Sequence, residues 1–81
     1  MENNFIALIN KSLEIGKDSV IMNETLQDNP RFDSLGVLMV LLMLEEEYGV
    51  IISSEDFQKF ITLEDLYQHV IGNTTKFISS N

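Results

Sequence analysis

The feature that most constrains the fold is an unbroken apolar segment, Leu35–Leu44, in a chain of only 81 residues. A helix over this segment would be apolar all round, and such a helix is normally buried on every side. A domain this small has too small a core to enclose a whole helix. We therefore expect one face to pack in the core and the opposite face to stay exposed. The predicted core face comprises Val37, Val40, Leu41, Leu44 and Tyr48, and the predicted exposed face comprises Leu35, Leu38, Met39 and Leu42.

The expected exposed face has two interpretations. One is that the helix is simply an unusually apolar core helix. The other is that the face binds partners, because contiguous exposed apolar surface usually marks an interaction site. Glutamates at 45–47 border it with charge, and the flexible thioether of Met39 adapts to different surfaces. We favour a partner-binding surface composed of Leu35, Leu38, Met39, Leu42, Glu45 and Glu46.

The chain is strongly acidic. Its 13 Asp and Glu residues outnumber 5 Lys and Arg residues, which gives a formal net charge of −8. Between Glu24 and Asp56, Arg31 is the only basic residue. This charge disfavours nucleic acid, whose binding depends on Lys and Arg contacts to phosphates, and anionic membrane surfaces as well. A field of one sign instead steers partners that carry basic patches.

Helical spacing of apolar residues predicts an all-α fold, without internal repeats or strand alternation. The expected helices span residues 5–15, 34–48, 55–59 and 62–71, with a long loop over 17–33. The expected N-caps are Asn3 or Asn4, Asp33 or Ser34, Ser53 or Ser54, and Thr62, and the expected stops are Gly16, Gly49 and Gly72. Asp65 completes a capping box with Thr62. We expect one domain over 1–72 and a loose tail over 73–81.

The composition excludes several kinds of catalytic or metal site. Without cysteine there is no disulfide, thiolate nucleophile or Cys-type zinc site. The single histidine, His69, leaves Ser34–His69–Asp as the one conceivable triad, yet nothing places Ser34 near His69 or supplies an oxyanion hole. No stretch has the alternating ligands, central Gly and terminal Glu of an EF-hand. We expect no catalytic residue and no metal, and a surface position for His69.

The sequence also bears on location. No apolar run reaches the ~18 residues that a bilayer-spanning helix needs. Residues 1–5 lack the basic and apolar regions of a secretory signal. We expect a cytoplasmic protein that is a monomer.

Several motifs then follow one another in a single register. They are Asp33-Ser34-Leu35, Leu44-Glu45-Glu46-Glu47-Tyr48-Gly49-Val50, Ser54-Glu55-Asp56 and Thr62-Leu63-Glu64-Asp65-Leu66. Through these motifs the stretch 26–70 resembles the acyl carrier protein family. The resemblance implies a four-helix bundle with a long loop between helices 1 and 2 and a short third helix.

The resemblance also implies a function and a cofactor. In this family the serine of the triplet carries 4′-phosphopantetheine on a phosphodiester, and Ser34 stands at that position between Asp33 and Leu35. The family does no chemistry itself. Its partners are phosphopantetheinyl transferase and the acyl-loading, condensing and acyl-transferring enzymes. A phosphate on Ser34 at a helix N-terminus would lie near backbone N–H groups and the positive end of the helix dipole.

Three features depart from the pattern of carriers for fatty acid synthesis. Gly36 and Met39 stand where that pattern has acids, and the loop before the triplet reads Asp28-Asn29-Pro30-Arg31-Phe32. The departures favour a dedicated polyketide, specialised lipid or aminoacyl pathway. The alternatives are general fatty acid synthesis, or a non-enzymatic helical adaptor that binds one protein through the second helix.

Overall fold

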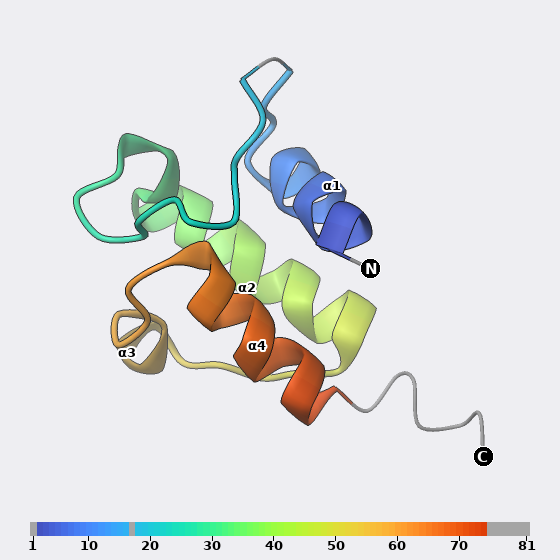
Figure 1. Ribbon diagram of the computed structural model, residues 1–81. Helices are drawn as coiled ribbons and strands as arrows, with labels where there is room; N and C mark the ends of the chain where they lie inside the picture. The colour runs from blue at the N-terminus through green and yellow to red at the C-terminus, as the bar shows by residue number, and fades with distance from the viewer. Residues whose placement is uncertain (1, 17, 75–81) are drawn as a thin grey trace.

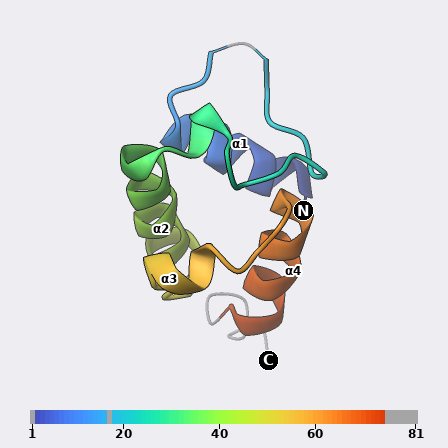
Figure 2. The same cartoon turned by 90° about the vertical axis from the view of Figure 1, so that its left-hand side faces the viewer.

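Four α-helices and one 3-10 helix form the fold in a computed structural model that describes residues 2–16 and 18–74. In chain order they are α1 (Glu2–Ser12), η1 (Pro30–Phe32), α2 (Ser34–Tyr48), α3 (Ser54–Phe57) and α4 (Leu63–Asn73). Figure 1 shows α2 and α4 running beside each other, and Figure 2 shows the four α-helices around a common centre. The predicted all-α bundle, with its long first loop and short third helix, is confirmed.

The core is filled by side chains from every helix and from the long loop. Phe5 of α1 is fully buried, and its ring centroid lies 6.1 Å from that of Tyr48 and 5.0 Å from that of Tyr67. Burial raises the pKa of the Tyr48 phenol above its usual value of 10.0, with further contributions from Tyr67 and Glu47, so the ring stays neutral in the core. The side chains with no exposed surface are Phe5, Ile9, Val40, Leu44, Leu63, Leu66 and Val70.

The first helix differs from its predicted range of 5–15 at both ends. It begins at Glu2, so Asn3 and Asn4 lie within the helix and do not cap it. It ends at Ser12, four residues before Gly16. The prediction was wrong at the C-terminal end because a helix can be terminated by residues other than glycine.

Two backbone hydrogen bonds form at the C-terminal end of α1, where the chain turns away from the helix. The Ile15 N–H donates to the Asn10 carbonyl at 2.9 Å, and the Glu14 N–H donates to the Lys11 carbonyl at 3.1 Å. These are the two bonds of a Schellman motif, which needs a residue in the left-handed region after the helix. Glu14 fills that position with φ 58°. A non-glycine residue is strained there, and it turns the chain earlier than the sequence predicted.

The other helix ends largely follow the predicted capping residues. Asp33 caps α2, and Gly49 ends it with φ 69°. Ser53 caps α3, and Thr62 forms the predicted capping box with Asp65. Two helices depart from their predicted ends. α3 spans Ser54–Phe57 where 55–59 was predicted, and α4 continues through Gly72 to Asn73. Residues 75–81 of the predicted tail lie outside the described residues, whereas the Thr74 hydroxyl donates to the Tyr48 carbonyl at 2.6 Å.

Backbone hydrogen bonds hold the long loop against the start of α4. The Leu26 N–H donates to the Ile61 carbonyl at 3.0 Å, and the Leu63 N–H donates to the Glu24 carbonyl at 2.9 Å. Thr25 and Thr62 face each other in an isolated antiparallel bridge. The loop thereby satisfies backbone groups that would otherwise be left unpaired. None of the described helices is long and apolar enough to cross a membrane.

The acidic charge leads to a prediction about stability. Within residues 2–16 and 18–74, the ion pairs are Arg31–Glu24 at 3.6 Å and Lys59–Asp56 at 3.3 Å. Most carboxylates therefore repel one another in the folded state. Raising NaCl, or adding millimolar Mg²⁺, should screen this repulsion and stabilise the fold by roughly 1 kcal/mol, a rise of about 4–8 °C in Tm. Thermal unfolding followed by circular dichroism measures the Tm at each salt concentration. A Tm that stays constant across these concentrations would contradict the prediction.

Candidate functional site

Ser34 is the first residue of α2 and is exposed. The N-cap is the preceding residue, Asp33, whose Oδ1 accepts a hydrogen bond from the Gly36 N–H at 2.7 Å. The Asp33 carbonyl accepts from the Val37 N–H at 2.8 Å. Because Asp33 supplies the cap, the Ser34 side chain is not needed to begin the helix. Its hydroxyl is therefore available for modification at the positive end of the helix dipole.

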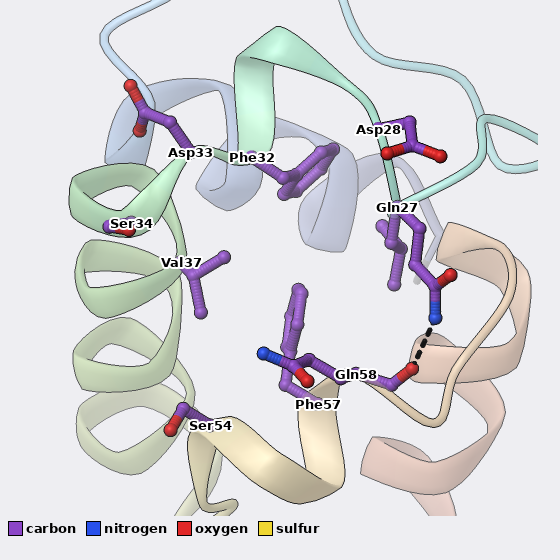
Figure 3. Close-up of a pocket in the computed structure, with 10 residues that line it drawn as sticks. Gln27, Asp28, Phe32, Asp33, Ser34, Val37, Ser54, Phe57 and Gln58 are labelled. Atoms are coloured by element: carbon purple, nitrogen blue, oxygen red, sulfur yellow. Dashed lines mark hydrogen bonds between the residues drawn. The ribbon is translucent and has the colours of Figure 1, made fainter.

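An open cleft of about 620 Å³ begins beside Ser34. Figure 3 shows its lining residues arranged between α2, η1, α3 and the long loop. The rings of Phe32 and Phe57 both line it and lie close together, with centroids 6.3 Å apart and ring planes inclined by 39°. Leu26 and Val37 complete the apolar part of the wall, and the polar lining residues are Gln27, Asp28, Asp33, Ser34, Ser54 and Gln58. The cleft therefore offers an apolar wall next to an exposed hydroxyl.

A side-chain hydrogen bond ties two walls of the cleft together. The Gln27 Nε2 donates to the Gln58 carbonyl at 2.6 Å, which links the long loop to the end of α3 (Figure 3). The two residues are far apart in the sequence, so no local pattern could have predicted their contact. Phe57 belongs both to the core and to the cleft.

The turn before Ser34 is held by a network around Asn29. The Asn29 Oδ1 accepts from the Arg31 N–H at 3.0 Å, and its Nδ2 donates to the Glu24 carboxylate at 2.9 Å. Glu24 also pairs with the Arg31 guanidinium at 3.6 Å. Pro30 follows as the first residue of η1, where its fixed φ suits the start of a helical turn. The Asn-Pro pair is a sequence signal for this turn, which was predicted only as part of the long loop over 17–33.

Gly36 lies where this turn meets α2, and it is buried. A Cβ atom at position 36 would lie 2.6 Å from the Arg31 carbonyl oxygen and 3.0 Å from the Leu13 Cδ2. The first of these separations is shorter than real Cβ contacts allow, and the neighbouring atom belongs to the backbone. An acidic side chain at this position would therefore clash with the backbone of the turn. The turn Pro30–Phe32 approaches α2 so closely that only glycine fits.

The predicted exposed face of α2 is exposed in the structure. Leu35, Leu38, Met39 and Leu42 have 66%, 51%, 40% and 48% of their surface accessible. Val40, Leu44 and Tyr48 of the predicted core face are buried, whereas Val37 and Leu41 are half-buried. Met43 and Gly36 are buried too, although the predicted core face did not include them. Glu45 and Glu46 are exposed, and the binding role of the whole face stays a prediction.

Comparison with known proteins gives the family. The sequence profile of the family described as "Phosphopantetheine attachment site" matches residues 5–70. An acyl carrier protein of Clostridium perfringens is 30% identical over 69 residues, which cover 85% of this chain and 91% of the relative. The chain belongs to the acyl carrier protein family. An acyl carrier protein of Campylobacter jejuni is 31% identical over 64 residues, covering 79% and 83%, and one of Buchnera aphidicola is 28% identical over 69 residues, covering 85% and 87%.

Membership of the acyl carrier protein family defines what kind of molecule this is. It is a carrier and not a catalyst, and its prosthetic group is covalently attached 4′-phosphopantetheine. No solved structure gave a significant match to the chain.

His69 lies on the surface of this carrier protein, as predicted. It is exposed on α4, and its ring lies 5.2 Å from that of Phe60. The lining of the cleft beside Ser34 does not include it.

Proposed function

We propose that Ser34 carries the phosphopantetheine arm of this acyl carrier protein, and that the arm holds acyl intermediates as thioesters. The observation that carries the proposal is the position of Ser34, which is exposed at the first turn of α2 beside an open, partly apolar cleft. Phosphopantetheine supplies a terminal thiol, so the chain needs no cysteine of its own to hold a thioester. We also propose that the protein is monomeric and located in the cytoplasm.

The residues around Ser34 suit a phosphodiester. The N-terminus of α2 presents backbone N–H groups and a partial positive charge, which favour an anion. Leu26, Phe32 and Phe57 are buried, and they line the neighbouring cleft. These side chains offer apolar contact to a bound acyl chain without closing over it. Asp33 is fixed as the helix cap, and Leu35 is exposed on the other side of Ser34.

Ser34→Ala should abolish attachment of the arm. Incubation of the wild-type protein with phosphopantetheinyl transferase, Mg²⁺ and coenzyme A should add one phosphopantetheinyl group, measured as intact mass. Ser54→Ala is the matched control, because Ser54 is also exposed, begins a helix and lines the same cleft. It should be modified like the wild type. Full modification of Ser34→Ala, with circular dichroism unchanged, would show that the attachment site lies elsewhere.

We further propose that the carrier serves a dedicated pathway, either polyketide, specialised lipid or aminoacyl. The support is the first half of α2, where Gly36 is buried under the turn and Met39 is 40% exposed. Neither position can offer a carboxylate to a basic partner. A loading assay tests the proposed pathway by comparing two sets of enzymes on this carrier. One set is the acyl- and aminoacyl-loading enzymes of dedicated pathways, and the other is the loading enzymes of general fatty acid synthesis. Efficient loading by the enzymes of fatty acid synthesis would contradict the proposal.

Docking of the loading enzyme should depend more on apolar contact than on charge. Truncation of a desolvated anchor at an interface costs about 2 kcal/mol or more, whereas an exposed ion pair contributes roughly 0–1 kcal/mol. Leu38→Ala or Met39→Ala should therefore weaken binding more than Glu46→Gln, as measured by titration against the cognate loading enzyme. If Glu46→Gln is the most damaging of the three, charge governs docking instead.

A further inference from the structure

Gln27 and Asp28 lie at the boundary between two hollows in the protein surface. One hollow is the cleft of about 620 Å³ beside Ser34. The other, here called the second hollow, has a volume of about 390 Å³ and is lined by Thr25, Gln27, Asp28 and Ile61. Gln27 and Asp28 line both. An acyl chain that passed these two residues would leave the cleft and enter the second hollow.

The Gln27 side chain forms a hydrogen bond at this boundary. Its Nε2 donates to the Gln58 carbonyl at 2.6 Å. Figure 3 shows the bond on the opposite side of the cleft from Ser34. The acceptor is a backbone oxygen, so the bond does not involve the side chain of Gln58. The bond therefore closes the end of the cleft that lies away from Ser34.

The lining of the cleft also becomes polar at this end. Its apolar lining residues are Leu26, Phe32, Val37 and Phe57. Gln27 and Asp28 are exposed and polar. A methylene group that packs on the apolar wall is removed from water, which stabilises the folded state, whereas one that displaces water from polar groups gains little. The stabilisation per methylene should therefore fall where a chain reaches Gln27.

The backbone on either side of Gln27 is held in place. The Leu26 N–H donates to the Ile61 carbonyl at 3.0 Å, and the Leu26 side chain is buried. The Thr25 carbonyl accepts a hydrogen bond from the Asn29 Nδ2 at 2.8 Å. The boundary can therefore open by rotation of the Gln27 side chain, without movement of the loop.

The strength of the bond can be compared with the gain from burying a chain. One hydrogen bond shifts the equilibrium between the closed and open boundary by a factor of roughly 2–13. Each fully buried methylene contributes a factor of about four, so about two of them would offset the bond. The second hollow offers little such burial. Among the described residues that line it, only Ile61 is apolar, and Ile61 is itself 65% exposed.

We propose that Gln27 limits the length of the acyl cargo that this carrier protects. Its bond to the Gln58 carbonyl ends the cleft, so a short acyl chain is held by the apolar wall while the distal carbons of a long chain stay in water. The inference rests on the proposed function, because the cargo is attached through Ser34. It adds to that function the class of cargo, a short acyl group, and the residue that sets the limit.

Thermal unfolding of the loaded protein measures how much of the cargo is buried. Phosphopantetheinyl transferase loads the protein from coenzyme A analogues that carry butanoyl, hexanoyl, octanoyl, decanoyl or dodecanoyl groups through an amide, which survives heating. Each methylene buried in the folded state should raise the Tm by up to about 3–6 °C. In the wild type this rise should end before the dodecanoyl group. A steady rise across the whole series would overturn the proposal.

Three variants separate the hydrogen bond from the size of the side chain. Gln27→Ala removes both the bond and the bulk. Gln27→Glu keeps the size, but a carboxylate has no proton to donate to the carbonyl. Gln58→Ala is the matched control, because it removes a glutamine side chain from the same cleft and keeps the backbone acceptor.

The variants are compared as dodecanoyl-loaded proteins, after subtraction of each variant's effect on the Tm of the protein that carries the arm alone. Both Gln27 variants should then exceed the wild type by at least about 2 °C, because the long chain no longer has to break the bond. Gln58→Ala should match the wild type. An equal rise for Gln58→Ala, or a rise for Gln27→Ala without one for Gln27→Glu, would overturn the proposal.

Isoleucine methyl signals show whether the chain passes Gln27. In protein with ¹³C-labelled isoleucine methyl groups, the dodecanoyl group should shift the Ile61 signal in Gln27→Ala and leave it unchanged in the wild type. Ile51 is 81% exposed and lines neither hollow, so its signal should not respond in either protein. A shift of the Ile61 signal in the loaded wild type would show that Gln27 does not end the cleft, and would overturn the proposal.

Failure of this proposal and failure of the proposed function give different results. The intact mass of every loaded protein is measured before unfolding. If Ser34→Ala is loaded as fully as the wild type, the proposed function is wrong and the inference about Gln27 falls with it. If the arm is on Ser34 and the wild type and Gln27→Ala give the same Tm series, only the inference about Gln27 is wrong.

Discussion

Gly36→Ala should lower the free energy of unfolding by about 1–3 kcal/mol, the usual penalty for inserting a methyl group into a packed site. This is the reverse of the ordinary effect, since alanine in place of a helical glycine normally stabilises by roughly 0.5–1 kcal/mol. The reason is the Arg31 carbonyl oxygen, 2.6 Å from the position of the new Cβ. The oxygen belongs to the backbone, so the turn Pro30–Phe32 must shift.

Gly72→Ala is the matched control for this prediction. Gly72 also lies within an α-helix, but a Cβ there would meet nothing within 4 Å. The control should be neutral or stabilising by up to about 1 kcal/mol. Urea unfolding of both variants, followed by circular dichroism, gives the two values. Equal stabilisation by both substitutions would mean that the turn does not approach α2 as closely as the structure has it.

Leu44→Ala should destabilise the protein by about 2–5 kcal/mol, the usual cost of a cavity in a core. Leu44 has no exposed surface. A domain of this size has a free energy of unfolding at the lower end of the usual 5–15 kcal/mol, so the variant should be only marginally folded at 25 °C. At about 4–8 °C per kcal/mol, the fall in Tm is large enough to read from a single melt.

Leu38→Ala is the matched control on the same helix. Leu38 is 51% exposed, so its truncation should change the free energy of unfolding by less than about 1 kcal/mol. The two melts together test the orientation of α2 independently of any partner. A larger loss for Leu38→Ala than for Leu44→Ala would mean that the helix is turned the other way.

The parts of the fold that follow from short-range interactions could be predicted from the sequence. The Asp33 cap, the Gly49 stop and the Thr62–Asp65 box each join residues at most five apart. The division of α2 into buried and exposed faces followed from the small size of the chain. α1 was predicted less well, because Glu14 adopts a conformation that sequence reasoning reserves for glycine.

The site could be predicted only in part, because its surroundings come from distant segments. The place of Ser34 at the start of α2 could be predicted from the Asp33-Ser34-Leu35 triplet together with the motifs that follow it in the same register. The cleft depends on Phe32 and Phe57 meeting from separate elements, and on the bond between Gln27 and Gln58. No local pattern records such contacts.

The close approach of the turn to Gly36 has a consequence for protein engineering. An attempt to retarget this carrier by placing a carboxylate at position 36 changes two things, since the added side chain also displaces the backbone of Arg31. The loop that carries Asn29 and the first turns of α2 then have to be exchanged together. A chimera that transplants residues 29–39 as one block keeps both sides of the contact matched, whereas a point graft separates them.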